Sequence, residues 1–545
     1  MNRVTHMRTL ILGSALLIVA ACSSSTPSDG NKSSGGSSGT GATGTTSGGA
    51  GGTSGSAGAH TTGGSGATGG STGSGATGGS SATGGSGATG GSSGGAGGSV
   101  SAGAGGSTGG TGASGGSSMM AGAPGAGGAG MMAGAGGSAG GSSGGSAGAS
   151  GGSAGTSSGM MHWVGTWTAS PYATDSSNAP PSTLANAVLR QVTHVSLGGS
   201  QIRVQFSNLA GNGAVTIKGA HVALCKATPA VDSTIDTSTD KALAFSGMAG
   251  VTINQGQEVW SDPVDFALPA LGNVTITTSF GTVPSNLTSH AGSRTTSYLA
   301  SGSTDLASAS MSSATGTPHW FFISGIDVMA DASAKAVVAI GDSITDGRGT
   351  DRDHNNRWTD VLASRLQMNM PTADVAMCNQ GIGATNLAGT GTAAQARFAR
   401  DVLGTSGVKY AIILDGVNDI GSGNASATSL ETVYDQLCDA AHAKNVLVYG
   451  GTITPFGGNS YYSADHETQR QALNDYIRGK SGKNKLDGYI DFDAAVTDNG
   501  SPPKLQAQYA MWTANNPDGS ADGLHPGPAG YEKMGETPDL TLFTK

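Results

Sequence analysis

The chain has 545 residues and a formal net charge of −9, and 96 of its residues are glycine. Only three basic residues and one acidic residue precede residue 161, so the rest of the chain carries a net charge of −11. This negative balance argues against a nucleic acid or an anionic membrane surface as a partner. The rest, about 385 residues, is long enough to bury two hydrophobic cores.

Residues 1–22 have the pattern of an export signal. Arg3 and Arg8 precede the apolar run LILGSALLIVAA, which is too short to span a membrane and ends in small residues before Cys22. The ending VAAC is similar to the lipobox of bacterial lipoproteins, in which the cysteine becomes lipidated. This predicts export and a lipid anchor on Cys22 as the only membrane contact, and Ser23 resembles the signal for sorting to the outer membrane, facing the periplasm or the cell surface. An ordinary secretory signal is the alternative.

Residues 23–160 are composed almost wholly of Gly, Ser, Ala and Thr, and no aromatic residue occurs before Trp163. Such a segment cannot bury a core and is typical of a flexible linker. A chain of this length and composition would span roughly 60 to 70 Å on average. We therefore expect a disordered tether between the lipid anchor and the folded part.

Residues 161–330 show the two-residue period of half-buried strands. QIRVQFSN (201–208) alternates apolar and polar side chains, and AVTIKG and NVTITTSF repeat the pattern between turn residues. The pattern predicts an all-β domain, either a sandwich or a jelly roll. Trp163 and Trp167 are either core residues or a sugar-binding platform, and the core is the favoured interpretation.

Residues 331–545 have a different rhythm. Segments with a helical period, such as RWTDVLASRLQ and SLETVYDQLCDAAHAKN, alternate with apolar runs of strand length, at 336–341, 374–378, 409–415, 446–453 and 488–492. Five such strands predict a parallel sheet with helices on both faces. In sheets of this kind, ligands bind at the carboxyl ends of the strands.

The first of these strands ends in a Gly-Asp-Ser turn, within AVVAIGDSITDGRG. Ser343 follows the strand directly, so its hydroxyl would face a cleft, and Asp342 is expected to brace the turn. A serine nucleophile also needs a base and a group that orients the base. Near the C-terminus, DGLH places Asp522 and His525 so that the carboxylate can fold back to Nδ1 and leave Nε2 free for Ser343. A surface Asp-Gly turn with an incidental histidine is the alternative.

Two other strand ends carry candidate donors for an oxyanion, which is usually stabilised by backbone or amide N–H groups. They are NQGIGATN (379–386) and DGVNDIG (415–421), and the second contains Asn418. The amide of Asn418 is either a turn former or a donor.

These four stretches together resemble the GDSL, or SGNH, hydrolase family over essentially all of residues 335–545. The resemblance implies a flavodoxin-like α/β domain with a serine esterase site. GDSITDG is similar to the first block of the family and would carry the nucleophile Ser343. DGLH is similar to its fifth block and would supply Asp522 and His525.

The resemblance also implies an oxyanion hole made by the backbone N–H groups of Ser343 and Ala384 and the side chain of Asn418. The family normally has glycine at the position of Ala384. Alanine can serve there if its φ is negative, whereas a positive φ would strain it and would favour Gly383 as the donor.

DRDHNNRWTDVLASRL, TITPF and YIDFDAAV resemble a secreted bacterial subgroup with an N-terminal β-domain, for which arylesterase and polysaccharide deacetylase activities have been proposed. We therefore expect an esterase that acts on carboxylic esters, with an O-acetylated polysaccharide as one substrate. An arylesterase or lipase acting on small or lipid acyl esters is the alternative. A surface carbohydrate-binding protein with a vestigial hydrolase domain is the alternative of another class. No cofactor or metal is expected.

Three cysteines follow Cys22, an odd number for an oxidising compartment. Cys378 and Cys438 lie in apolar patterns and are expected to be buried, and no Cys/His spacing typical of a zinc site occurs. Of the remaining residues, the other histidines, among them His290, are expected to be structural or on the surface, and Arg357 is expected to pack or to lie near the rim of the cleft.

Overall fold

The computed structural model describes residues 160–226, 232–302, 305–311, 313–514 and 516–545. The predicted signal peptide, the lipidation of Cys22 and all but the last residue of the predicted tether lie outside this range. Within the described part of the chain, no helix is both long enough and apolar enough to cross a bilayer.

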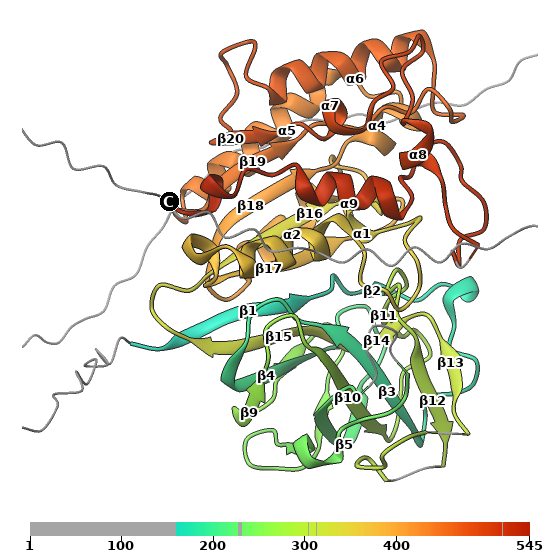
Figure 1. The fold of residues 1–545 in the computed structure, drawn as a ribbon. Helices are drawn as coiled ribbons and strands as arrows, with labels where there is room; N and C mark the ends of the chain where they lie inside the picture. The colour runs from blue at the N-terminus through green and yellow to red at the C-terminus, as the bar shows by residue number, and fades with distance from the viewer. Residues whose placement is uncertain (1–159, 227–231, 303–304, 312, 515) are drawn as a thin grey trace, which may run out of the picture. The chain divides into compact units, whose positions relative to one another are not determined.

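The first part of the described chain, which we call the β-module, consists of antiparallel sheets (Figure 1). One sheet has the strand order β1-β15-β4-β8 with β9 paired to β4, and a second has the order β13-β12-β3-β10-β5-β6 with β7 paired to β5. A small third sheet has the order β14-β11-β2. The strands are β1 His162–Thr168, β2 Tyr172–Ala173, β3 Ala187–His194, β4 Gly199–Ser207, β5 Val215–Leu224, β6 Lys241–Leu243, β7 Val251–Ile253, β8 Glu258–Trp260, β9 Val264–Leu268, β10 Asn273–Phe280, β11 Thr288–His290, β12 Ser297–Ser301, β13 Thr315–Thr317, β14 Trp320–Phe321 and β15 Ile323–Ala330.

The alternation seen in the sequence is the burial pattern of the strands. In β4, the side chains of Ile202, Val204 and Phe206 are completely buried, whereas the polar residues between them are only partly covered. Trp167 is also buried and packs edge-on against Trp320 with ring centroids 4.9 Å apart. This confirms that Trp167 is a core residue and not a sugar-binding platform.

The second part, which we call the α/β-module, contains a five-stranded parallel sheet with the order β17-β16-β18-β19-β20. Placing the first strand second in the sheet is the flavodoxin-like arrangement. The strands are β16 Lys335–Gly341, β17 Val375–Gly381, β18 Val408–Leu414, β19 Leu447–Gly451 and β20 Gly488–Ile490. The fold class predicted from the sequence is confirmed for both modules.

Helices cover both faces of the parallel sheet (Figure 1). α2 packs against α9, and α5 packs against α3 and α6. The helices are α1 Ser343–Asp346, α2 Trp358–Met368, α3 Ala394–Asp401, α4 Val417–Gly421, α5 Ala427–His442, α6 Ala464–Ile477, α7 Phe492–Val496, α8 Ala507–Ala510 and α9 Pro528–Glu536, with short 3₁₀ helices at Ser176–Asn178, Thr237–Thr239, Met370–Thr372 and Leu540–Phe543.

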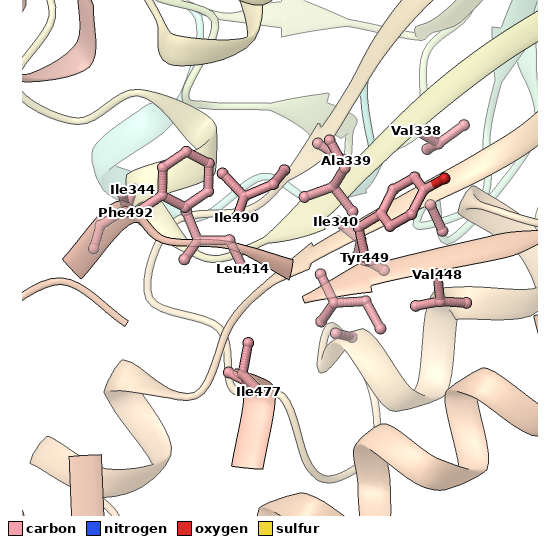
Figure 2. Close-up of a cluster of buried hydrophobic side chains, with 14 of the residues drawn as sticks. Val338, Ala339, Ile340, Ile344, Leu414, Val448, Tyr449, Ile477, Ile490 and Phe492 are labelled. Carbon is pink, nitrogen blue, oxygen red and sulfur yellow. The ribbon is translucent and has the colours of Figure 1, made fainter. Parts of the chain in front are cut away.

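The core of the α/β-module lies between the sheet and these helices. Figure 2 shows side chains of β16, β18 and β19 gathered with Ile477 of α6 and Phe492 of α7, and all of them are buried. Cys378 and Cys438 belong to the same cluster, as the sequence predicted, and burial raises the pKa of both thiols to about 12.

The carboxyl ends of the central strands are level with one another. Gly341, the last residue of β16, is paired with Gly381 of β17 and Leu414 of β18. A Cβ atom on Gly341 would lie 2.2 Å from the Leu414 carbonyl oxygen, so only glycine allows this approach. β17 runs three residues further than the sequence pattern indicates, because Asn379, Gln380 and Gly381 continue the pairing with β16.

The two modules belong to one compact unit. Ala336 and Ala376 of the parallel sheet lie in the hydrophobic cluster of the β-module. The Gly165 N–H donates to the carbonyl oxygen of Ser406 at 2.9 Å. The Ser406 hydroxyl donates to Asp327, which is also paired with Arg203 at 2.7 Å. The contacts at Ser406 join the β-module to the loop before β18, at the amino end of that strand.

Candidate active site

Ser343 is the first residue of α1 and follows β16 after a single residue. The Asp342 side chain accepts a hydrogen bond from the Ile344 N–H at 2.8 Å, so it caps α1 and braces the turn as predicted. The backbone N–H of Ser343 has no partner within the helix, because the first turn of a helix leaves its N–H groups unpaired. The Ser343 N–H donates to no other described residue either, so Ser343 offers both a hydroxyl and an N–H at the carboxyl end of β16.

The structure brings Ser343, His525 and Asp522 together. The Ser343 Oγ lies 2.7 Å from His525 Nε2, and His525 Nδ1 lies 2.7 Å from Asp522 Oδ2. Asp522 Oδ1 accepts hydrogen bonds from the N–H groups of Leu524 and His525, both at 3.0 Å. The turn thus folds the carboxylate back onto the ring, and Nε2 is left to face the serine.

The electrostatic surroundings favour a neutral His525 and an ionised Asp522. Burial lowers the pKa of His525; Asp522 raises it, and Arg348 and Arg294 lower it, so that it stays below its ordinary value. Burial alone would raise the pKa of Asp522, but the hydrogen bond and the charge of His525 hold it well below its usual range. A neutral imidazole oriented by a carboxylate can accept a proton from a serine hydroxyl.

The two candidate N–H donors of the 382–385 loop differ in their surroundings. Ala384 has a φ of +60°, so the negative φ that would suit an alanine is not present. However, the Gly383 N–H already donates to Asp346 Oδ2 at 3.1 Å, whereas the Ala384 N–H donates to no residue that the structure describes. Ala384 is therefore the available donor, and it occupies a backbone conformation that costs an L-residue about 1 kcal/mol.

Asn418 lies in α4 and is held by two hydrogen bonds. Its Nδ2 donates to the Thr385 carbonyl oxygen at 2.8 Å, and its Oδ1 accepts from the Tyr461 hydroxyl at 2.9 Å. One of the two N–H bonds of the amide remains for a ligand. A Cβ on Gly421 would lie only 2.2 Å from the Tyr461 ring, so glycine at this position makes room for the tyrosine.

The predicted residues line one open cavity with a volume of about 310 Å³. Besides the residues predicted from the motifs and Gly383, the lining contains Arg294, Arg348, Asn459, Ser460, Tyr461 and Leu524. The sequence analysis assigned no role to these six residues. Leu524 and Arg348 lie within the DGLH and GDSITDGRG stretches, whereas Asn459, Ser460 and Tyr461 lie in a loop without a recognisable motif. Arg294 comes from the β-module.

Two carboxyl groups at the ends of the central strands are also fully buried. Burial raises the pKa of Asp342 to about 7 and that of Asp415 well above its ordinary value, and the charge of Asp342 raises the pKa of Asp415 further. Asp415 Oδ1 accepts from the Gly416 N–H at 2.8 Å, but Oδ2 has no partner among the described residues. Burial and the neighbouring charge therefore both favour the neutral carboxyl over the carboxylate in this pair.

A family model, described as the GDSL-like lipase/acylhydrolase family, matches residues 339–533. This segment contains all five residues predicted for the site. None of the curated proteins matches the chain at a significant level.

Three solved structures with similarity to this chain have low identities and low TM-scores. A carbohydrate acetylesterase family member from Sinorhizobium meliloti is 14% identical, with 38% of this chain and 97% of that chain covered and a TM-score of 0.29. A GDSL-like lipase from Bacteroides thetaiotaomicron is 19% identical, with coverages of 38% and 87% and a TM-score of 0.28. The aryl esterase of M. smegmatis is 15% identical, with coverages of 37% and 95% and a TM-score of 0.28.

Proposed function

Residues 339–533 belong to the GDSL-like lipase/acylhydrolase family, so the protein is an ester hydrolase, and we propose that Ser343, His525 and Asp522 carry its reaction. The observation that supports this most directly is the chain of two 2.7 Å contacts from Ser343 through His525 to Asp522. A nucleophile, a base and a group that orients the base are the three parts that serine esterases require.

The proposed reaction is a two-step acyl transfer. Ser343 attacks the ester carbonyl while His525 Nε2 takes the hydroxyl proton, and a tetrahedral intermediate forms. Its oxyanion accepts hydrogen bonds from the N–H groups of Ser343 and Ala384 and from the amide of Asn418. His525 then protonates the leaving alcohol, which leaves the acyl group on the Ser343 oxygen. A water molecule attacks this acyl-enzyme while His525 takes its proton, and His525 returns the proton to the Ser343 oxygen as the carboxylic acid leaves.

The lining of the cavity supports a short or polar acyl group. Among the described residues that line it, Leu524 is the only large aliphatic side chain, and the charged and polar ones include Arg294, Arg348 and Asn459. A long acyl chain would gain stability mainly by burying apolar surface, and beside Leu524 and the Tyr461 ring the described lining consists of charged, polar or small residues. We therefore propose an O-acetylated polysaccharide as the substrate class, in preference to lipid acyl esters.

We also propose that the protein is exported and anchored to a membrane by a lipid on Cys22. An enzyme held at a membrane surface on a long tether could reach an extracellular or periplasmic polymer without leaving the cell. The negative net charge after residue 160 supports a partner that is not a nucleic acid.

The test is a substrate panel measured on the wild-type protein and on Ser343→Ala. Acetylated xylan, acetylated pectin, O-acetylated peptidoglycan and p-nitrophenyl esters of increasing chain length separate the substrate classes. We expect release of acetate from at least one polysaccharide and less than about 1% of wild-type activity for Ser343→Ala, which should remain folded. Activity above that level in the variant would exclude Ser343 as the nucleophile. Binding of glycans without cleavage of p-nitrophenyl acetate would instead identify a carbohydrate-binding protein.

A further inference from the structure

One segment of the β-module reaches the candidate active site. It consists of β11 and the loop that follows, residues 288–296, and we call it the 288–296 segment. Arg294 from this segment lines the same cavity as Ser343 and His525. The segment makes two ion pairs with the α/β-module, through His290 and Arg294.

The first ion pair joins His290 to Asp346, the last residue of α1. His290 Nε2 lies 2.9 Å from Asp346 Oδ1, and Nδ1 lies 2.9 Å from the Ser170 carbonyl oxygen. A carbonyl oxygen and a carboxylate oxygen are both acceptors, so each ring nitrogen of His290 faces an acceptor. Both side chains are at most 5% exposed, so solvent screens the pair very little.

Asp346 also contacts the 382–385 loop, which carries Ala384 and which we call the oxyanion loop. Its other oxygen, Oδ2, accepts the N–H of Gly383, the residue before Ala384. Burial alone would raise the pKa of Asp346, but the neighbouring His290 lowers it below its ordinary value, so the carboxylate is an ionised acceptor. The bond from the Gly383 N–H is therefore charge-assisted, and such bonds are roughly twice as strong as neutral ones.

The backbone of the segment is fitted closely to Asp346. A Cβ on Gly292 would lie 2.0 Å from Asp346 Oδ2, so a side chain at this position would displace the carboxylate. Arg357 also links the 288–296 segment to α1. Its guanidinium donates to the carbonyl oxygens of Gly292 and Ser293 in the segment and of Asp346 in α1.

The second ion pair joins Arg294 to the loop that leads to His525. Arg294 Nη1 donates to both carboxylate oxygens of Asp518, at 2.8 and 2.6 Å. Asp518 Oδ2 also accepts from the Gly349 N–H at 3.2 Å, in the loop after α1. Asp518 lies four residues before Asp522, so Arg294 ties the start of the Asp522–His525 turn to the chain that follows Ser343.

We propose that the β-module contributes positioning residues to the esterase site. His290 positions the oxyanion loop through Asp346, and Arg294 positions the Asp522–His525 turn through Asp518. This inference rests on the proposed function. His290 and Asp346 act as positioning residues, since they act on the reaction through Gly383 and its neighbour Ala384. The β-module would then be required for turnover and would not serve only as a separate binding domain.

The experiment compares turnover and stability in single variants of the full chain. In His290→Ala, we expect kcat for p-nitrophenyl acetate to fall about 10- to 100-fold with little change in KM, because oxyanion contacts are stronger in the transition state than in the bound substrate. His290→Gln keeps one donor toward Asp346, so it should retain more activity than His290→Ala. Arg294→Lys should retain more activity than Arg294→Ala for the same reason.

The matched control is Asp327→Ala. It also removes a buried carboxylate at the contact between the modules, because Asp327 accepts from Ser406 of the α/β-module and pairs with Arg203 of its own module. Asp327 does not line the catalytic cavity. We expect Asp327→Ala to lower the melting temperature as much as His290→Ala does, and to leave kcat within about twofold of the wild type.

The outcomes separate this inference from the proposed function. A fall in kcat for His290→Ala, partial recovery in His290→Gln and an unchanged kcat in Asp327→Ala support positioning. A wild-type kcat in His290→Ala, or equal losses in His290→Ala and Asp327→Ala, would overturn it. The proposed function is tested by Ser343→Ala alone: activity retained in that variant would overturn it. The positioning role is tested by the His290 variants, so the two failures give different results.

Discussion

At the scale of single residues, Ala384 is where this chain departs most clearly from the family that it resembles. Its φ of +60° is typical of glycine, and its side chain is exposed. The neighbouring Gly383 cannot take over without giving up its hydrogen bond to Asp346. The cavity lined by Ser343 therefore keeps a strained alanine, and such strain is common at functional sites.

Ala384→Gly tests this strain. Glycine normally destabilises a folded chain by about 0.5 to 1 kcal/mol relative to alanine, but here it should relieve a cost of similar size. We expect the melting temperature to stay the same or to rise and kcat to be retained. Ala443→Gly is the control, because Ala443 is also exposed but has a φ of −61°, and this variant should be destabilised. Equal losses in the two variants would show that Ala384 is not strained.

With His525 as the proposed base, we expect the charges around it to set the pH at which the enzyme becomes active. Asp522, Arg348, Arg294 and the hydroxyl of Ser343 face the ring, and the two arginines lower its pKa. A nearby positive charge disfavours the protonated ring, so its removal must raise the pKa of His525.

In Arg348→Gln, we therefore expect the acid limb of the kcat/KM profile to move to higher pH. Arg348 is 42% exposed, so the shift should shrink as the salt concentration rises. Lys444→Gln, which removes an exposed charge outside the cavity, is the control and should leave the profile unchanged. A shift to lower pH in Arg348→Gln would contradict the assignment of His525 as the base.

At the scale of elements, the ends of β16, β17 and β18 supply the frame of the site. Gly341 is level with Gly381 and Leu414, so the loops that follow these strands start from one edge of the sheet. The 288–296 segment packs against this frame from the β-module, and the fit depends on a glycine. This makes the contact between the modules sensitive to small changes in the backbone.

Gly292→Ala tests the closeness of this fit. The added methyl would lie 2.0 Å from the Asp346 carboxylate, so either the carboxylate or the segment must move. Overpacking of this kind costs about 1 to 3 kcal/mol, and we expect a lower melting temperature together with a loss of kcat. Gly213→Ala is the control, because the nearest atom to its added methyl is 3.7 Å away. Unchanged turnover in Gly292→Ala would mean that Asp346 can move without effect on the oxyanion loop.

At the scale of the whole molecule, the chain combines a compact two-module enzyme with an N-terminal region whose composition predicts an anchor and a tether. The two modules contact each other in the hydrophobic core, where Ala336 and Ala376 pack with the β-module, and at the catalytic cavity, which Arg294 of the β-module lines. We therefore expect membrane attachment and catalysis to be separable, because the residues that govern them lie in different parts of the chain.

Cys22→Ser in the full chain, expressed in a Gram-negative host, tests this separation. We expect the wild-type protein to partition with membranes and to incorporate a labelled fatty acid, and the variant to lose both properties while its specific activity on p-nitrophenyl acetate stays the same. Membrane association of the variant equal to that of the wild type would contradict lipid anchoring at Cys22.

Much of the fold and of the site could be predicted from the sequence because the relevant patterns are local. A two-residue period reports burial on one face of a strand, and alternating strands and helices report a parallel sheet. Ser343, Asn418, Asp522 and His525 each lie in a short motif at a strand end or a turn, and these residues line one cavity in the structure.

Only the tertiary structure decided how the parts of the site depend on one another. The φ of Ala384, the bond from the Gly383 N–H to Asp346 and the hydroxyl of Tyr461 on Asn418 follow from packing and leave no periodic trace in the sequence. The two ion pairs of the 288–296 segment join residues 56 and 224 positions apart. Hydrogen bonds act over about 3 Å in space, and residues so far apart in the chain come within that distance only when both modules have folded.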